Sequence, residues 1–421
     1  MEQFAKLGAL IGGRWRDENY DENLFPGIAA RALSEFNLLE RIDPWQIVRW
    51  LFTTANVPEQ MDPDAVFGDP PITLYVGSRF YIDAYYWLDG TTSIHQHSFS
   101  GAFQLLLGSS VHSRYRFENP QEINPRFLVG DILLDDVSLL RKGDIREIVA
   151  GPQLIHSLFH LERPSVTITV RTHKAPSAPV QYTYRKPFIA YDPFFKDQLV
   201  ARQVQTVGLL LGMKHPEADD IIGSLLDTAD FQTTYAILEI AFASLCHRDL
   251  ETLFGLSRSN ERFQALLDRA RARHGELADR LLPVLEEKWR QNDVARRRDQ
   301  IKGEDHRFFL ALLLNVPERQ AILKLIRERF PDRDAIELVV GWVSELAATK
   351  IFGSHEPNVL GIGEFDERHL FVLKELLTGN TSEQIEARLA TEPSRAAKFQ
   401  PSVSALANHI KAMTLFKSIL N

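Results

Sequence analysis

The pattern of apolar and polar residues changes twice along this chain. From 28 to 54 the apolar residues fall at helical spacing, and Asp43 stands before Pro44 as an N-cap. From about 72 to 173, short runs rich in β-branched and aromatic residues are separated by Gly, Asp and Asn. From 196 to 420 helical spacing returns almost without a break. The pattern predicts two opening helices, a barrel or sandwich of short strands, and a long all-α region.

The expected strands and domain limits follow from the same pattern. The runs that we expect to be strands are 80–87, 102–107, 113–117, 131–140, 144–149 and 165–171. Proline and aspartate gather between 58 and 72, which marks a linker or a long surface loop. We expect an α+β multidomain fold with an N-terminal helical segment and linker over 1–70, a barrel over 71–190 and an all-α domain over 191–421. Because its apolar stripes can close on one another, the all-α region is expected to fold independently of the barrel.

Composition narrows the possible functions. The residues are 44% hydrophobic and 25% charged, as in an ordinary globular protein, and the formal net charge is -8. No overall positive field exists to hold a nucleic acid or an anionic membrane, so neither is an expected partner. The basic run Arg296–Arg298 is mixed with Asp293 and Asp299, which favours a solvated helix face.

Cysteine content and apolar runs bear on the compartment. Cys246 stands alone, so an intramolecular disulfide is excluded. No stretch has the roughly 18 uninterrupted apolar residues of a membrane span. The first apolar run is short for an export signal and is soon followed by Arg14 and Arg16. We expect a cytoplasmic protein that does not enter membranes.

Three histidines carry the clearest chemical signal. His95 and His97 are two residues apart in an expected strand, so both imidazoles lie on one face, about 6 to 7 Å apart along the backbone. His156 follows the turn-forming pair Gly151-Pro152 at the start of another β-run. Three neutral imidazoles from two strands suit Fe, Ni, Cu, Co or Zn and leave coordination positions open. The alternative is a His-x-His pair on an edge strand that faces solvent.

These residues resemble the two motifs of the cupin superfamily, over roughly residues 75–173. The first motif is matched by Gly90, His95, His97 and Gly108, and the second by Gly151, Pro152 and His156. The phrase Ser93–His97, with Trp87 upstream, looks most like the thiol dioxygenases, the cysteine dioxygenase-like group, which hold one iron with three histidines. Gly101 or Ala102 stands where many cupins carry a ligand glutamate. The resemblance therefore implies a jelly-roll barrel with a three-histidine site for Fe(II).

The sequence departs from that family where the substrate is bound. The family's late catalytic tyrosine would fall near Arg171, and its substrate-binding arginine has only Arg79 as a loose counterpart. An inward-facing Arg171 is able to clamp a substrate carboxylate, although a solvent-exposed strand end is the plainer interpretation. His160 is a candidate second donor or alternative ligand, or an ordinary interior histidine. Tyr85 is our candidate for a pocket hydroxyl, but either face of its strand explains core packing equally well.

Two functions fit these residues. The first is a mononuclear non-haem iron oxygenase or dioxygenase, whose partners are O2 and a small molecule, a thiol or a small acid. The second is a non-catalytic metal- or ligand-binding barrel that signals to a helical domain, which then contacts another protein. Three ligands without a convincing fourth favour the open site of an enzyme over a structural metal.

Overall fold

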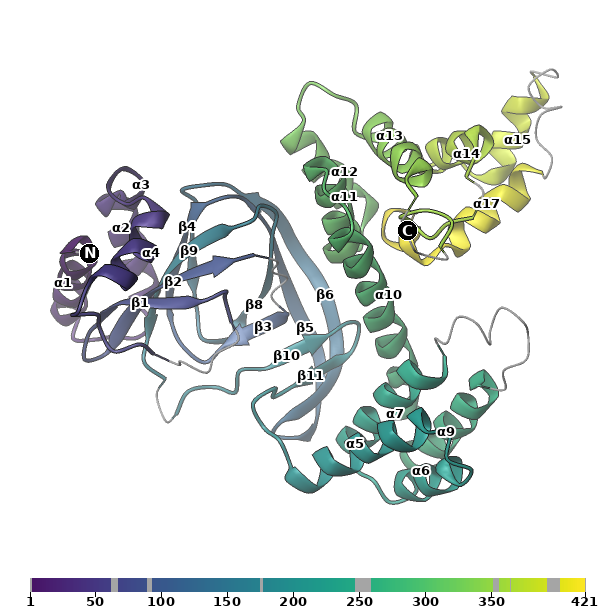
Figure 1. The fold of residues 1–421 in the computed structure, drawn as a ribbon, viewed down its shortest axis with the longest axis horizontal. Helices are drawn as coiled ribbons and strands as arrows, with labels where there is room; N and C mark the ends of the chain where they lie inside the picture. The colour runs from purple at the N-terminus through teal and green to yellow at the C-terminus, as the bar shows by residue number, and fades with distance from the viewer. Residues whose placement is uncertain are drawn as a thin grey trace.

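The computed structural model describes residues 2–61, 67–88, 93–174, 177–246, 259–350, 356–363, 365–391 and 402–420. Helices come first, strands occupy the middle of the chain, and helices follow to the end (Figure 1). The opening helices are α1 (Glu2–Asp17), α2 (Phe25–Phe36), α3 (Leu38–Arg41) and α4 (Pro44–Thr53). This arrangement confirms the α+β class with a barrel between a short N-terminal and a large C-terminal helical part.

The strands form two layers of antiparallel β-structure. They are β1 (Pro71–Val76), β2 (Phe80–Trp87), β3 (Ile94–His97), β4 (Gly101–Leu107), β5 (Ser110–Asn124), β6 (Phe127–Leu140), β7 (Ile145–Ile148), β8 (Gly151–His160), β9 (Ser165–Thr172), β10 (Thr183–Arg185) and β11 (Ile189–Tyr191). One sheet has the order β1-β2-β9-β4-β7, and the other strands close on themselves in the order β10-β11-β6-β5-β8-β3. All six expected runs lie within or overlap strands.

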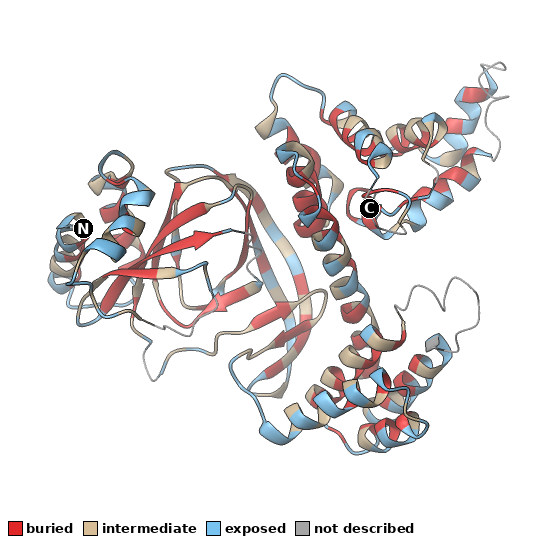
Figure 2. Ribbon diagram, in the orientation of Figure 1, coloured by how far each residue is buried: buried red, intermediate tan, exposed pale blue. Residues whose placement is uncertain are grey.

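The five-stranded sheet is buried on both faces. The sequence left open which alternating set of β2 side chains lines the barrel, and the packing of each face answers this. Every residue of β2 is buried (Figure 2). Ile82, Ala84 and Tyr86 pack with α1, α2 and α4 in one hydrophobic core, together with Ile168 and Val170 of β9. Since strand side chains alternate, the other set of β2, which includes Tyr85, faces the interior between the two layers.

The N-terminal helices cover the outer face of that sheet (Figure 1). Helix α4 begins where the sequence predicted, because Asp43 accepts a hydrogen bond from the Trp45 amide and Pro44 occupies the first turn. Helix α1 was not predicted. Its buried face of Phe4, Leu7, Ile11 and Trp15 has clear helical spacing.

The C-terminal helices follow the last strand. They are α5 (Gln198–Gly212), α6 (Ala218–Leu226), α7 (Phe231–Leu245), α9 (Ser259–His274), α10 (Leu281–Asp299), α11 (Glu304–Asn315), α12 (Arg319–Arg329), α13 (Ala335–Ala348), α14 (Glu367–Leu377), α15 (Ser382–Ala390), α17 (Val403–Ala412) and α18 (Lys417–Leu420), with 3₁₀ turns at Gly275–Arg280 and Thr414–Phe416. Several begin at side-chain caps, namely Asp197, Asp230, Asp334, Asp366, Thr381 and Ser402.

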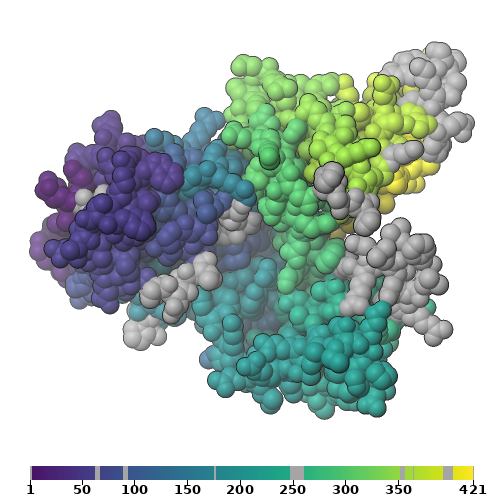
Figure 3. Space-filling model, viewed as in Figure 1, coloured from purple at the N-terminus to yellow at the C-terminus, as the bar shows by residue number. Residues whose placement is uncertain are grey.

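These helices share buried cores with the barrel. Phe127, Val129 and Ile189 pack in one core with α5, α6, α7, α9 and α10. Val111 and Phe159 belong to a second core with α10 to α18. Figure 3 shows the green helical region directly against the blue barrel. Because buried clusters cross both expected boundaries, the division into 1–70, 71–190 and 191–421 and the independent folding of the helices stay predictions.

The basic run on α10 is a solvated helix face only at Arg296, which is exposed, and not at its next two residues. Arg297 and Arg298 are 8% and 3% exposed. Arg297 binds Asp293 and Glu356, and the Arg298 guanidinium lies 4.3 Å from the Phe159 ring centre. This cation–π contact joins the longest described helix to the barrel. Within the described residues, no helix is both long and apolar enough to cross a membrane.

We predict that Ile168→Ala lowers the free energy of unfolding by about 2 to 5 kcal/mol, because the Ile168 side chain is fully buried between the sheet and the N-terminal helices. Urea denaturation measures the change. Leu133→Ala is the control, since Leu133 is 41% exposed on β6 and its loss is expected to cost less than about 0.5 to 1 kcal/mol. If both substitutions lowered the free energy of unfolding by the same small amount, the outer face of the five-stranded sheet would not be covered by the helices.

Candidate metal centre

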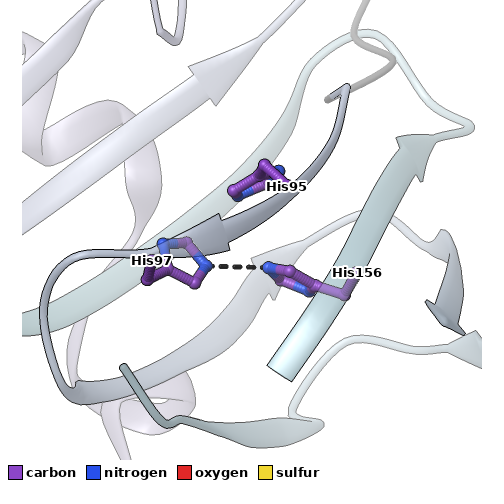
Figure 4. A group of neighbouring side chains, drawn as sticks. All are labelled: His95, His97 and His156. Carbon is purple, nitrogen blue, oxygen red and sulfur yellow. Dashed lines mark hydrogen bonds between the residues drawn. The ribbon is translucent and has the colours of Figure 1, made fainter. Parts of the chain in front are cut away.

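The three histidines predicted as ligands lie together inside the barrel. His95 and His97 are on β3, and His156 is on β8, directly opposite His95 in the antiparallel pairing. The pairing shifts register between His95 and His97. All three side chains are buried, and one nitrogen from each ring lies within 4.8 Å of the other two. Figure 4 shows the His97 and His156 rings turned toward each other from the two strands.

The ring nitrogens are arranged to meet at one point. The Nε2 atoms of His97 and His156 are 2.8 Å apart. His95 Nδ1 lies 2.7 Å from the Ser93 carbonyl oxygen, so its N–H donates there and the Nε2 lone pair stays available. His97 Nδ1 is buried without a hydrogen-bond partner. Two nitrogens that face each other, next to a third with a free lone pair, are the donor set that one ion requires.

Burial keeps these imidazoles neutral. Desolvation lowers the pKa of His95 below its ordinary value, and it lowers the pKa values of His97 and His156 much further. Positive charge on the neighbouring rings acts in the same direction, and the Arg171 guanidinium adds to it at His97. Metal ligation needs the neutral ring, so the group is in its ligating form at neutral pH.

No carboxylate belongs to this group among the described residues. Gly101 is one of the two positions, with Ala102, where the resemblance would place a ligand glutamate, and it pairs with Arg171 of β9. A Cβ atom at Gly101 would lie 1.9 Å from the Val170 carbonyl oxygen, closer than any side chain tolerates. The backbone itself therefore excludes a fourth ligand at Gly101. Three neutral imidazoles fit a transition-metal ion with open positions.

Tyr85 and Arg171, two of the candidate catalytic residues, are brought together next to the histidines. Arg171 donates from Nη1 to the Tyr85 hydroxyl at 3.3 Å, and that hydroxyl donates to Asp83 at 3.0 Å. The guanidinium lies between the rings of Phe99 and Tyr81, 3.8 and 5.0 Å from their centres. Its Nε atom is buried without a hydrogen-bond partner. Arg171 is thus a half-buried cation whose Nε donor is buried and unused, not a solvent-exposed strand end.

His160, the third candidate, lies outside the group. It follows His156 by four strand positions, roughly 13 Å along β8. Its ring stacks on Trp87 at 4.5 Å, and its Nδ1 atom is 2.9 Å from the Ser110 hydroxyl oxygen. Its Nε2 atom has no partner, and burial lowers its pKa to about 3. These contacts describe a buried neutral histidine at the far end of the barrel.

Other residues of the motifs and their surroundings are placed as follows. Gly90 lies outside the described residues, and Gly108 has φ +84 at the end of β4. Arg79 stacks on Tyr20 at 4.3 Å, on the side of the N-terminal helices. Sequence analysis missed Phe67, which contacts the His95 ring at 5.8 Å. It also missed His112, which contacts His156. Neither Phe67 nor His112 is part of a recognisable sequence motif.

Comparisons with known proteins assign no family to this chain. No family model and no curated protein sequence matches this chain. Hydroquinone 1,2-dioxygenase from Sphingomonas sp. TTNP3 is similar over 26% of this chain and 68% of its own, at 11% identity and TM-score 0.21. DMSP lyase DddQ from Ruegeria pomeroyi is similar over 25% and 43%, at 16% identity and TM-score 0.18. Peruvianin-I, a cysteine peptidase from Thevetia peruviana latex, matches over 24% and 53%, at 18% identity and TM-score 0.18. These three proteins have different activities.

We predict that the chain binds about one transition-metal ion and that His97→Ala or His156→Ala abolishes binding, because each removes one of three ligands. Elemental analysis after purification without added metal gives the ratio. His369→Ala is the control: this histidine is also buried but bonds to Asp366 at the start of α14. Full metal content in the first two variants would contradict the site.

Acid is predicted to destabilise the metal-free protein. The pKa of His160 falls from an ordinary 6.5 to about 3 in the folded state. The unfolded chain therefore binds more protons between these pH values, and the free energy of unfolding decreases as the pH falls. Each such histidine contributes about 1.4 kcal/mol per pH unit. His160→Gln is expected to reduce this slope in urea denaturation between about pH 4 and pH 6, and an unchanged slope would contradict a neutral buried ring.

Proposed function

We propose that this chain is a mononuclear metal-dependent cupin that oxidises a small anionic molecule, a thiol or a small acid, with O2. The observation that carries the proposal is the buried group of three neutral histidines beside a cation with unused donors, Arg171. Iron(II) is the proposed metal, with Ni, Co, Cu or Zn as competitors for the same imidazoles. Such an ion supplies redox chemistry toward O2 and open positions for substrate.

The charges around the histidines favour an anionic substrate. Among the described residues Arg171 forms no direct ion pair, and the Asp83 carboxylate acts on its charge from the other side of the Tyr85 hydroxyl. Arg146 donates only to the Ile145 carbonyl oxygen among the described contacts. Burial lowers the pKa of His112, and the positive charge of Arg146 acts in the same direction. A substrate carboxylate or thiolate would compensate these cations, and Arg171 offers it charge-assisted hydrogen bonds.

Tyr85 has a separate proposed role. Burial and the nearby Asp83 carboxylate raise the pKa of its hydroxyl, so this hydroxyl stays protonated at neutral pH. The hydroxyl is held between Asp83, which accepts a hydrogen bond from it, and Arg171, which donates one to its oxygen. We propose that Tyr85 fixes the direction of the Arg171 guanidinium, while the rings of Phe99 and Phe67 exclude water from the histidines.

The direct test is reconstitution under anaerobic conditions. Metal-free protein is loaded with Fe(II), Ni(II), Co(II), Cu(II) or Zn(II), and oxygen uptake is followed with thiols, amino acids and keto acids. Uptake that requires both iron and one substrate, and is lost in His156→Ala, is the expected result. No turnover with any metal and any substrate would refute the oxygenase.

Arg171→Gln is predicted to lower kcat/KM by roughly 10- to 100-fold, mainly through KM, because a charged hydrogen bond to the substrate is lost. The metal content is expected to stay the same, since Arg171 contributes no ligand. The control is Arg79→Gln, which removes a guanidinium stacked on Tyr20 outside the histidine group. A loss of activity in Arg79→Gln but not in Arg171→Gln would indicate that Arg79, and not Arg171, binds the substrate.

A second function is a binding barrel that reports its occupancy to the helical part. The observation that favours it is the packing of α10 on β8, where Arg298 covers Phe159 three residues from His156. In that case metal or ligand binding without turnover would change hydrogen exchange in α10. Cytoplasmic location and a protein partner for the helices remain part of this proposal.

A further inference from the structure

His112 contacts a histidine of the metal group from a third strand. It lies on β5, is 3% exposed, and its Nε2 atom is 3.0 Å from Nδ1 of His156. The two rings are nearly perpendicular, with an angle of 87° and centres 5.2 Å apart. The pairing of β5 with β8 places Arg114 opposite His156 and His112 opposite Leu158. His112 is therefore a diagonal cross-strand neighbour of His156 on the same sheet face.

The contact determines which nitrogen of His156 carries hydrogen. A neutral imidazole has one N–H and one lone pair. The Nε2 atom of His156 faces Nε2 of His97, where a shared ion would need its lone pair. In that state Nδ1 of His156 carries the proton and donates to Nε2 of His112. Nε2 of His112 is then an acceptor, and the His112 proton is on its Nδ1 atom.

We infer that His112 is a positioning residue that holds His156 in the ligating tautomer and orientation. This inference rests on the proposed metal site. Ligating histidines usually donate their second N–H to a carboxylate, a carbonyl or water. Here the acceptor is another neutral imidazole, and Phe103 packs edge-on against His112 at 6.2 Å.

The choice of acceptor affects the charge of the site. A carboxylate acceptor would pull the proton from His156 and add negative charge next to the ion. A neutral imidazole acceptor adds no negative charge. Three neutral ligands would therefore leave the positive charge of the ion uncompensated. Arg146 adds positive charge near His112, whereas Arg114 is paired with Asp135 and Asp136. An electropositive centre of this kind attracts an anionic substrate, in agreement with the unpaired donors of Arg171.

Metal affinity and the ligand-field spectrum test the role of His112. Metal-free wild type, His112→Leu and His112→Gln are titrated with Co(II), and the dissociation constant and visible bands are recorded. His112→Leu is expected to bind Co(II) roughly 10 to 100 times more weakly, with shifted bands. His112→Gln is expected to recover most of the affinity, because its amide oxygen accepts the same hydrogen bond. Ser113→Ala is the matched control, since Ser113 is buried in the adjacent position of β5 and its hydroxyl has no partner.

The outcomes separate this inference from the proposed function. A wild type that binds no metal overturns the metal site itself. Normal affinity and spectrum in His112→Leu overturn the inference and leave the site intact. Equal losses in His112→Leu and His112→Gln would show that packing, not the acceptor, is required, and would also overturn it.

A second measurement covers the case in which His112→Leu does not fold. Nitrogen-15 NMR of zinc-loaded wild type reports the protonated nitrogen of each histidine ring. The expected result is a protonated Nδ1 and a metal-shifted Nε2 for His156, with a non-protonated Nε2 for His112. A His156 ring protonated at Nε2 would overturn the inference.

Discussion

Strand β3 is hydrogen-bonded to β8 on one side and to β10 on the other, although it has only four residues. His95 is opposite His156 of β8 and opposite Thr183 of β10. Between the histidines, Gln96 is fixed by the Tyr184 hydroxyl at 2.6 Å and by the Val180 carbonyl oxygen at 2.6 Å. A slip of one residue would turn both imidazoles to the opposite face. The geometry of the whole site, and every contact of Arg171 and His112 with it, depends on this register.

The local sequence was sufficient to predict features that depend only on neighbouring residues, such as strand alternation and helix capping. Alternation in β3 placed two histidines on one face, and the cap at Asp43 fixed the start of α4. The same alternation did not show which face of β2 turned inward, because helices bury its second face as deeply as the barrel buries the first. His112 has no motif, since its significance comes from a cross-strand contact over 44 residues of chain. The acids near Arg298 suggested a solvated surface, but packing against Phe159 determined its burial.

The helices and the metal centre are close enough for each to affect the other. Strand β8 carries His156 on its inner face and Phe159 on its outer face. Arg298 is 3% exposed at this contact, and its burial lowers the pKa of the guanidinium. Strand β5 contributes His112 to the inside, while Tyr115 reaches the Asn315 carbonyl oxygen of α11 at 3.5 Å. Strands β5 and β8 thus contact the histidine group on one face and the C-terminal helices on the other.

The missing space at Gly101 also limits how this protein can evolve. If β4 and β9 left room for a side chain at Gly101, one substitution there would offer a carboxylate as a fourth ligand beside the three histidines. Here the Val170 carbonyl oxygen occupies that volume, so any such descendant would first have to separate β4 from β9 and lose ladder hydrogen bonds in the sheet that supports Arg171. The intermediate would be destabilised before it gained a ligand. A carboxylate at Gly101 is therefore harder to gain than a change in the side chains around the three histidines.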